Sequence, residues 1–163
     1  MAVGVKFAIK DAIDMTITGK NSQTSTRIDY LNSCGLTLES ESVYAKKKGN
    51  DAIAFSGSRS GQFTMDAEVI DDQFLCWMLG GTMDESGKIS VTGDVPNESY
   101  TIEGTFKVQT TEGTQTRTIK FYNCSPQANT DLTLSATEVS SFSLVFDVLV
   151  DEDSNILDLT PQA

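Results

Sequence analysis

The sequence predicts a mainly β protein built from two packed antiparallel sheets, as a sandwich or a partly closed barrel, with one short flanking α-helix. Several segments alternate apolar and polar residues, clusters of turn-forming residues separate them, and only one segment has apolar residues at helical spacing. The 163 residues include no linker-like composition, so we expect a single domain, 1–163. Within it we expect an N-terminal arm (1–11), a long basic loop (43–61) and a C-terminal tail (151–163).

Two strands are expected before the basic loop. Residues 13–18 alternate apolar and polar side chains, which predicts a first strand, and residues 19–25 interrupt it. Residues 36–41 alternate in the same way and predict a second strand, which we expect to extend back through Ile28 and Tyr30. The polar face of this second strand carries Thr37, Glu39 and Glu41.

Segment 43–61 differs from the rest of the chain in its charge and its turn formers. It concentrates basic residues in an acidic protein and contains the turn-forming runs Gly-Asn-Asp (49–51) and Ser-Gly-Ser (56–58). We therefore predict a long exposed loop that is mobile in the monomer and becomes ordered on assembly. Its basic residues are Lys46, Lys47, Lys48 and Arg59.

A strand and a helix follow this loop directly. Residues 62–69 alternate strictly, which predicts a strand with one solvated face. Asp71 is suited to cap a helix that ends at Gly80, and Trp77 is expected in the core or at a subunit interface. A helix of this length spans only about 12 Å and is unstable alone in water, so it must pack on the sheet. The residues expected to pack are Phe74, Leu75, Met78 and Leu79.

The second half of the chain predicts further strands. Residues 82–99 indicate a connection around a short strand, and residues 100–121 indicate a hairpin that turns at Glu112 and Gly113. The longest alternation, at 142–150, predicts a central strand. We expect the acidic tail to be free in the monomer and to dock in an assembly.

The charge balance argues against binding to nucleic acid or to membranes. Lys plus Arg is 12 and Asp plus Glu is 23, and the net charge of −11 opposes contact with phosphates or anionic lipids. No apolar run approaches the ~20 residues that cross a bilayer, and the N-terminus lacks the apolar core of a signal peptide. We expect synthesis in a cytoplasm, with Cys34, Cys76 and Cys124 as reduced thiols.

Motifs for catalysis and cofactor binding are missing from the sequence. The chain has no histidine, which removes the commonest general base and transition-metal ligand, and no phosphate-binding loop. Asp151, Asp153 and Asn155 match the opening of a calcium loop, but Ile156 and Gln162 stand where that loop needs glycine and glutamate. We expect no catalytic residue, no metal and no cofactor.

The order of features between residues 28 and 81 resembles that of the tail tube proteins, or major tail proteins, of tailed bacteriophages. The matching segments are ESVYAKKKG, AFSGSRSGQFTMDAEV and the amphipathic helix that ends in LGG. The resemblance implies two packed antiparallel sheets with a flanking helix, six copies in a ring, and rings stacked into the hollow tube that carries DNA. The remaining β-rich sequence, including SSFSLVFDVLV near the C-terminus, is compatible with this fold.

The resemblance also implies roles for two groups of residues. The basic loop would contact the next ring, because a contact between two different patches can propagate into a filament. Polar strand faces would line a water-filled channel whose acidic wall repels DNA. The inter-ring residues are Tyr44, Lys46, Lys47, Lys48 and Arg59. The lumen-lining residues are Thr37, Glu39, Glu41, Gln62, Thr64, Asp66 and Glu68.

The same resemblance implies partners for the chain, and two other classes of function are weighed against it. The implied partners are further copies of the chain, the tape measure protein and the tail end proteins, in a virion tail through which DNA passes without specific binding. A surrounding sheath is left open, as is a ring protein of a related contractile injection or secretion device. A carbohydrate-binding β-sandwich would share the fold class but lacks an evident aromatic platform, and an enzyme lacks a nucleophile motif.

Overall fold

The computed structural model describes the backbone of residues 7–21, 23, 25–30, 32–94, 98–127 and 135–161, with the side chains of these residues apart from 7–13, 41–44 and 51–58. Strands and a single helix alternate with short connections along these residues. In chain order the elements are β1 (Phe7–Gly19), β2 (Ser25–Ile28), β3 (Ser33–Lys47), β4 (Asn50–Ala67), α1 (Asp72–Leu79), β5 (Thr82–Met83), β6 (Ile89–Ser90), β7 (Tyr100–Thr110), β8 (Gly113–Pro126), β9 (Phe142–Leu149) and β10 (Leu157–Pro161).

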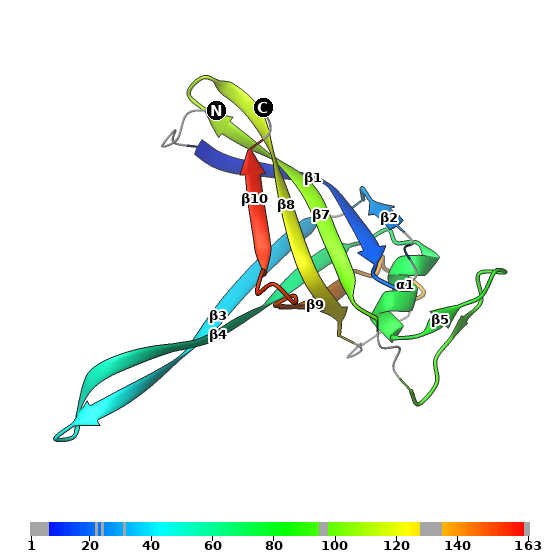
Figure 1. Ribbon diagram of the computed structural model, residues 1–163. Coiled ribbons are helices and arrows are strands. Elements are labelled where there is room, and N and C mark those ends of the chain that lie inside the picture. The colour runs from blue at the N-terminus through cyan, green and yellow to red at the C-terminus, as the bar shows by residue number, and fades with distance from the viewer. Residues whose placement is uncertain are drawn as a thin grey trace.

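Most of the strands join in one large antiparallel sheet (Figure 1). Its order is β2-β1-β7-β8-β9-β4-β3, and β10 also pairs with β8. Residues 117–121 of β8 pair with β10, whereas residues 123–126 pair with β9. Because two strands share this edge of β8, the sheet divides there. Figure 1 shows the β7–β8 hairpin and the β3–β4 pair leaving the body in different directions.

The core lies on the inner face of this sheet, where alternate residues of β1, β4, β7, β8 and β9 are buried. The sheet curves, so that the rings of Phe63 in β4 and Phe121 in β8 have centroids 4.8 Å apart although β9 lies between their strands. The prediction of a mainly β protein with one short helix is confirmed. The large sheet is accompanied by a small one that contains β5 and β6.

The ends of α1 form as the sequence predicts. The side chain of Asp71 accepts a hydrogen bond from the Phe74 backbone N–H at 2.8 Å, which satisfies one of the free donors of the first turn. Gly80 ends the helix with a φ of 64°, a left-handed conformation that glycine adopts without strain. Its N–H reaches back to the helix carbonyls, so both ends of this short helix are capped.

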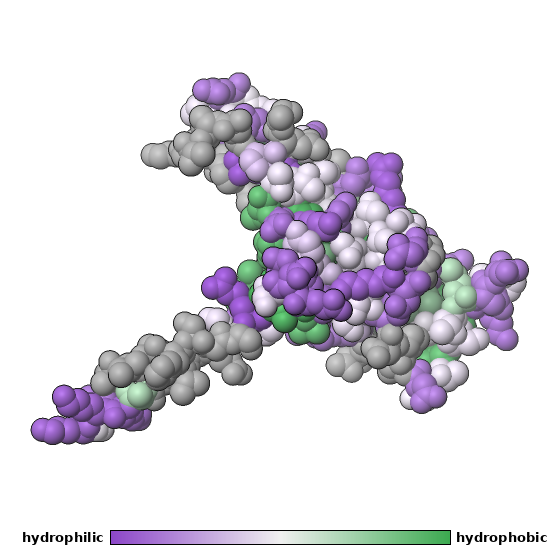
Figure 2. Space-filling view, viewed as in Figure 1, coloured by the Kyte–Doolittle hydropathy of each residue, from purple (hydrophilic) through white to green (hydrophobic). Residues whose placement is uncertain are grey.

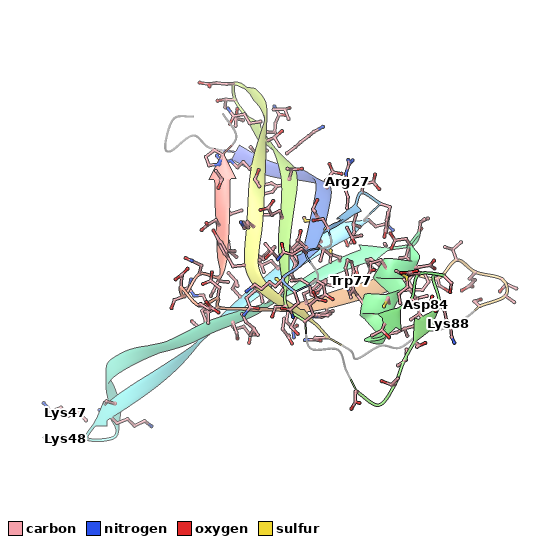
Figure 3. All side chains as sticks on the ribbon, turned by 45° about the vertical axis from the view of Figure 1, so that its right-hand side comes forward. Arg27, Lys47, Lys48, Trp77, Asp84 and Lys88 are labelled. Atoms are coloured by element: carbon pink, nitrogen blue, oxygen red, sulfur yellow. The ribbon has the colours of Figure 1, made fainter. Side chains whose placement is uncertain are left out.

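The face of α1 that packs on the sheet differs in part from the prediction. Phe74 and Met78 are buried as expected, but Leu75 and Leu79 are only half-buried. Trp77 lies on the buried face instead, with its ring 5.7 Å from that of Tyr100 (Figure 3). Residues three and four positions apart share one face of a helix. Because Phe74, Trp77 and Met78 form the face that packs on the sheet, Leu75 and Leu79 lie at the edge of that face.

The predicted basic loop at 43–61 is wrong, because these residues belong to paired strands. The register of β3 and β4 runs from Ser33 opposite Asp66 to Lys47 opposite Asn50. Lys48 and Gly49 form the turn with φ values of 52° and 80°, the positive pair that a two-residue hairpin turn requires. The register shifts twice on the way, and such bulges bend and twist a strand pair. We call residues 40–59 the ribbon.

The sequence also predicts both chain ends outside the sheet, and the described parts of both lie within it. Residues 7–11 of the predicted arm belong to β1, while residues 1–6 lie outside the described residues. In the predicted free tail, β10 pairs with β8, and Ile156 and Leu157 pack against the core. Ile28 belongs to the separate strand β2, which pairs with β1 rather than extending β3.

A glycine just outside the ribbon, at its base, provides a test of the pairing between β3 and β4. A Cβ atom on Gly61 would lie 2.4 Å from the Thr37 carbonyl oxygen and 2.7 Å from Leu38 Cδ2, so the backbone of β3 would have to move. We expect Gly61→Ala to lower the free energy of unfolding by about 1–3 kcal/mol in urea denaturation. Gly35→Ala is the control, since a Cβ there meets no atom within 4 Å, and equal losses in both variants would contradict the close approach.

Candidate functional site

The outer face of β3, β4 and β9 carries most of the residues predicted to line a channel. Rows of cross-strand neighbours run over this face, and one row contains Thr37, Gln62 and Asp147. The structure therefore places five predicted residues on one face, namely Thr37, Glu39, Gln62, Thr64 and Asp66. Glu68 lies just beyond the end of β4 and is exposed, and the side chain of Glu41 lies outside the described residues.

A hollow of about 230 Å³ opens on this outer face where the ribbon leaves the sheet. Two carboxylates, those of Glu39 and Asp147, contribute to its wall. Asp147 is held in place because its Oδ1 accepts a hydrogen bond from Gln127 Nε2 at 2.7 Å. The lining residues, which we call the hollow, are Thr37, Glu39, Ser60, Gly61, Gln62, Asp147 and Leu149. The alternation over 142–150 placed Asp147 on the polar face of its strand, but it could not show that this strand pairs with β4.

Asp66 has a structural role that the strand pattern did not reveal. It lies between Ser33 of β3 and Ser143 of β9 in the register, and it is half-buried. Its carboxylate accepts a hydrogen bond from Ser33 Oγ at 3.0 Å and another from Ser143 Oγ. Asp66 therefore ties three strands together, whereas a residue that only lines a channel would have no such partners.

The turn of the ribbon presents positive charge far from the core. Lys46, Lys47 and Lys48 are exposed, and Figure 3 shows Lys47 and Lys48 at the end of the ribbon. Lys47 lies opposite Asn50 in the last pair before the turn, and Lys48 forms the turn with Gly49. Arg59 is exposed near the base, and the side chain of Tyr44 lies outside the described residues. The structure thus separates Arg59 from the three lysines of the predicted inter-ring group.

A second polar face, on β1, β7, β8 and β10, was not singled out from the sequence. This face continues onto β2 and holds two ion pairs, since Arg27 Nη2 of β2 lies 2.9 Å from Asp14 Oδ1 and Lys120 Nζ lies 3.3 Å from Glu103 Oε1. The only sequence signal was threonine at alternate strand positions, which β-propensity explains equally well. The threonines of this face are Thr16, Thr18, Thr101, Thr105, Thr114, Thr116, Thr118 and Thr160.

The thiols do not provide reactive groups. Burial raises the pKa of Cys124 to about 12. Burial, with a smaller contribution from the Asp66 carboxylate, raises the pKa of Cys34 to about 11. The nucleophilic form of cysteine is the thiolate, which these values make scarce at neutral pH. Cys76 is also buried, and its Sγ donates to the Gly81 carbonyl oxygen at 3.2 Å.

Two aspartates, Asp84 and Asp151, organise turns by accepting hydrogen bonds from their own loops. Asp151 Oδ1 accepts from the backbone N–H groups of Asn155 at 2.7 Å and Asp153 at 3.0 Å, and these bonds lower the pKa of Asp151. Asp84 accepts from Ser86 in the β5–β6 turn, which lowers its pKa in the same way (Figure 3). Across the described residues, no group of three His, Cys, Asp or Glu side chains could hold a metal ion.

No protein-family model matches this chain, and no curated protein matches it. Within the part of the chain that the structure describes, no helix is long and apolar enough to cross a bilayer. The arrangement that remains is a polar sheet face with a hollow at one place and an exposed cationic tip at another, which is suited to contact with other macromolecules.

The role of Asp66 can be tested against Glu68, its neighbour on the same predicted face. We expect Asp66→Ala to lower the free energy of unfolding by about 1–3 kcal/mol, because two hydroxyl groups lose a charged acceptor. Glu68→Ala should change it by no more than about 0.5 kcal/mol, because Glu68 is exposed beyond the strand end. Chemical denaturation of both variants gives the comparison, and an unchanged Asp66→Ala stability would show that the serine contacts do not hold the strands.

Proposed function

We propose that this protein is a structural subunit that assembles with copies of itself into stacked rings, forming a hollow tube of the bacteriophage tail tube kind. The number of six copies per ring comes from the sequence resemblance described above, and so does the tail tube fold with its two packed sheets. In this proposal the protein resides in the virion tail and contacts the tape measure protein and the tail end proteins, while DNA passes through the channel.

The observation that carries the proposal is the ribbon, which projects a cationic tip away from an acidic body (Figure 1). A strand pair that extends beyond its sheet buries little of its own surface in the monomer, so its length is best explained by a contact outside the chain. A contact between a tip and a different patch is heterologous and can repeat from copy to copy. Stacking of rings is one such repeat.

The free edges of the sheet also favour self-assembly. Within the described residues, β3 pairs only with β4 and β10 pairs only with β8, so each leaves one edge without a partner strand. Apolar side chains are exposed on both, with 39% of Leu36, 41% of Leu38 and 56% of Leu159 accessible to solvent. Figure 2 shows apolar atoms at the surface between β10 and the ribbon. Open edges with apolar side chains invite pairing with another chain, which neighbours in a ring would supply.

The channel wall in this proposal is one of the two polar sheet faces. The face of β3, β4 and β9 is acidic and would repel DNA, which is the role that the resemblance implies for Glu39 and Gln62. The face of β1, β2, β7, β8 and β10 is rich in threonine, and its Arg27 and Lys120 are each paired with a carboxylate. Away from the ribbon, the described side chains of the two faces form no cluster of cations that would hold phosphates, so either face is compatible with a wall along which DNA slides.

The lining of the hollow supports a carbohydrate-binding role less well than it supports self-assembly. Sugar sites commonly use an aromatic ring as a stacking platform, because ring faces pack well against the apolar face of a sugar. The residues that line the hollow include no aromatic side chain. Self-assembly therefore remains the better account of this face.

The proposal is tested by the oligomeric state of the purified protein. We expect sedimentation velocity to show particles that grow with protein concentration, and negative-stain electron microscopy to show rings and hollow tubes. High salt should shift the distribution toward smaller particles, because it screens the attraction between the cationic tip and an acidic surface. A monomer at every concentration and salt condition, with no rings after tail initiation complexes are added as seeds, would refute the proposed function.

A further inference from the structure

We infer that the hollow is the socket that receives the lysine tip of another copy's ribbon. This inference rests on the proposed self-assembly and names the surface on the neighbouring copy that makes the contact. The occupant is a second copy of this chain, and the groups that enter are the ammonium groups of Lys47 and Lys48.

The chemistry of the hollow matches that of a lysine side chain. The described residues that line it include the carboxylates of Glu39 and Asp147 and no cationic group. Thr37, Ser60 and Gln62 add oxygen atoms that can accept hydrogen bonds, and an ammonium group has three donors to satisfy. Leu149 supplies an apolar wall, against which the methylene stem of a lysine can pack while its charged end reaches the carboxylates.

The charges of the tip and of the hollow are not neutralised by ion pairs within the described part of the chain. Among the described residues the two ion pairs are Arg27 with Asp14 and Lys120 with Glu103, so neither the hollow nor the tip belongs to one. Arg59 is close in sequence, but it neighbours Ser60, and alternation along the strand turns it to the opposite face of β4. The two lysines nearest the turn, Lys47 and Lys48, match the two carboxylates of the hollow in number.

The geometry requires that the lysines come from another copy. Lys47 lies eight residues along β3 from Glu39, which at about 3.3 Å per residue places the tip roughly 26 Å from the hollow. Backbone pairing with β4 continues over this whole length, so the ribbon cannot fold back on its own base. A tip that enters the hollow of a neighbour leaves its own hollow free for the next copy. The contact therefore propagates in one direction, as a stack of rings does.

Charge exchange between two variants tests the socket. The tip variant is Lys47→Glu with Lys48→Glu, and the hollow variant is Glu39→Lys with Asp147→Lys. Each alone should reduce the yield of tubes at low salt at least ten-fold, because like charges then meet. A mixture of the two should restore tubes, because each tip now meets a hollow of opposite charge. Restoration also shows that both variants are folded. The control is Glu85→Lys with Glu152→Lys, which changes the net charge by the same amount and sign as the hollow variant, at exposed sites away from the hollow, and should assemble as the wild type does.

A direct readout of the contact completes the test. Wild-type tubes made from a mixture of ¹⁴N- and ¹⁵N-labelled protein are treated with a carbodiimide, which joins lysine amines to carboxylates that touch them. We expect mixed-label cross-links from Lys47 or Lys48 to Glu39 or Asp147. Normal tube formation by the hollow variant, with no such cross-links, would overturn the socket and leave the proposed function standing. Failure of the wild type to form rings or tubes would overturn both.

Discussion

The apolar inner face of β4 is the constraint on which the rest of the structure depends. Phe63, Met65 and Ala67 are buried at alternate positions, and over this stretch β4 is hydrogen-bonded to β3 on one edge and β9 on the other. Burying a large apolar side chain is worth about 1.5–3 kcal/mol, so a slip of one residue would expose these groups and place polar ones in the core. The same alternation places Gln62 and Asp66 on the outer face.

The ribbon is an extension of these core strands. Residues 61–66 of β4 have neighbours on both edges, whereas residues 50–60 pair with β3 alone. A two-stranded hairpin is only marginally stable by itself in water, but this one continues strands that the core already holds. The position of the lysine tip relative to the hollow is consequently set by the backbone pairing between them. The tip and the hollow therefore lie at opposite ends of the same strand pair, at a fixed separation.

The two outer faces of the large sheet differ in how their charges are satisfied. On β1, β2, β7, β8 and β10, Arg27 is paired with Asp14 and Lys120 with Glu103. On β3, β4 and β9 the carboxylates of Glu39 and Asp147 line a hollow whose described lining residues include no cation. Since surface ion pairs contribute little to folding, this difference has a small effect on stability. Its effect on contacts with other chains is larger, because charge complementarity selects partners.

The local patterns of the sequence determined the elements that depend on neighbours in the chain. Alternation predicted the strands around Met15, Phe63 and Phe146, the turn formers predicted the β7–β8 hairpin, and the Asp71 and Gly80 caps bounded the helix, because each of these signals acts over a few residues. The sequence patterns did not show that residues 43–61 are paired strands, because the lysines and turn formers of this segment indicated a loop. The hydrogen bonds that hold each strand come from the other strand. Only the tertiary structure decided that β8 is shared between β9 and β10, that Trp77 faces the core in place of Leu75, and that Asp147 and Glu39 line one hollow. These outcomes depend on contacts between segments far apart in the chain, which no local periodicity records.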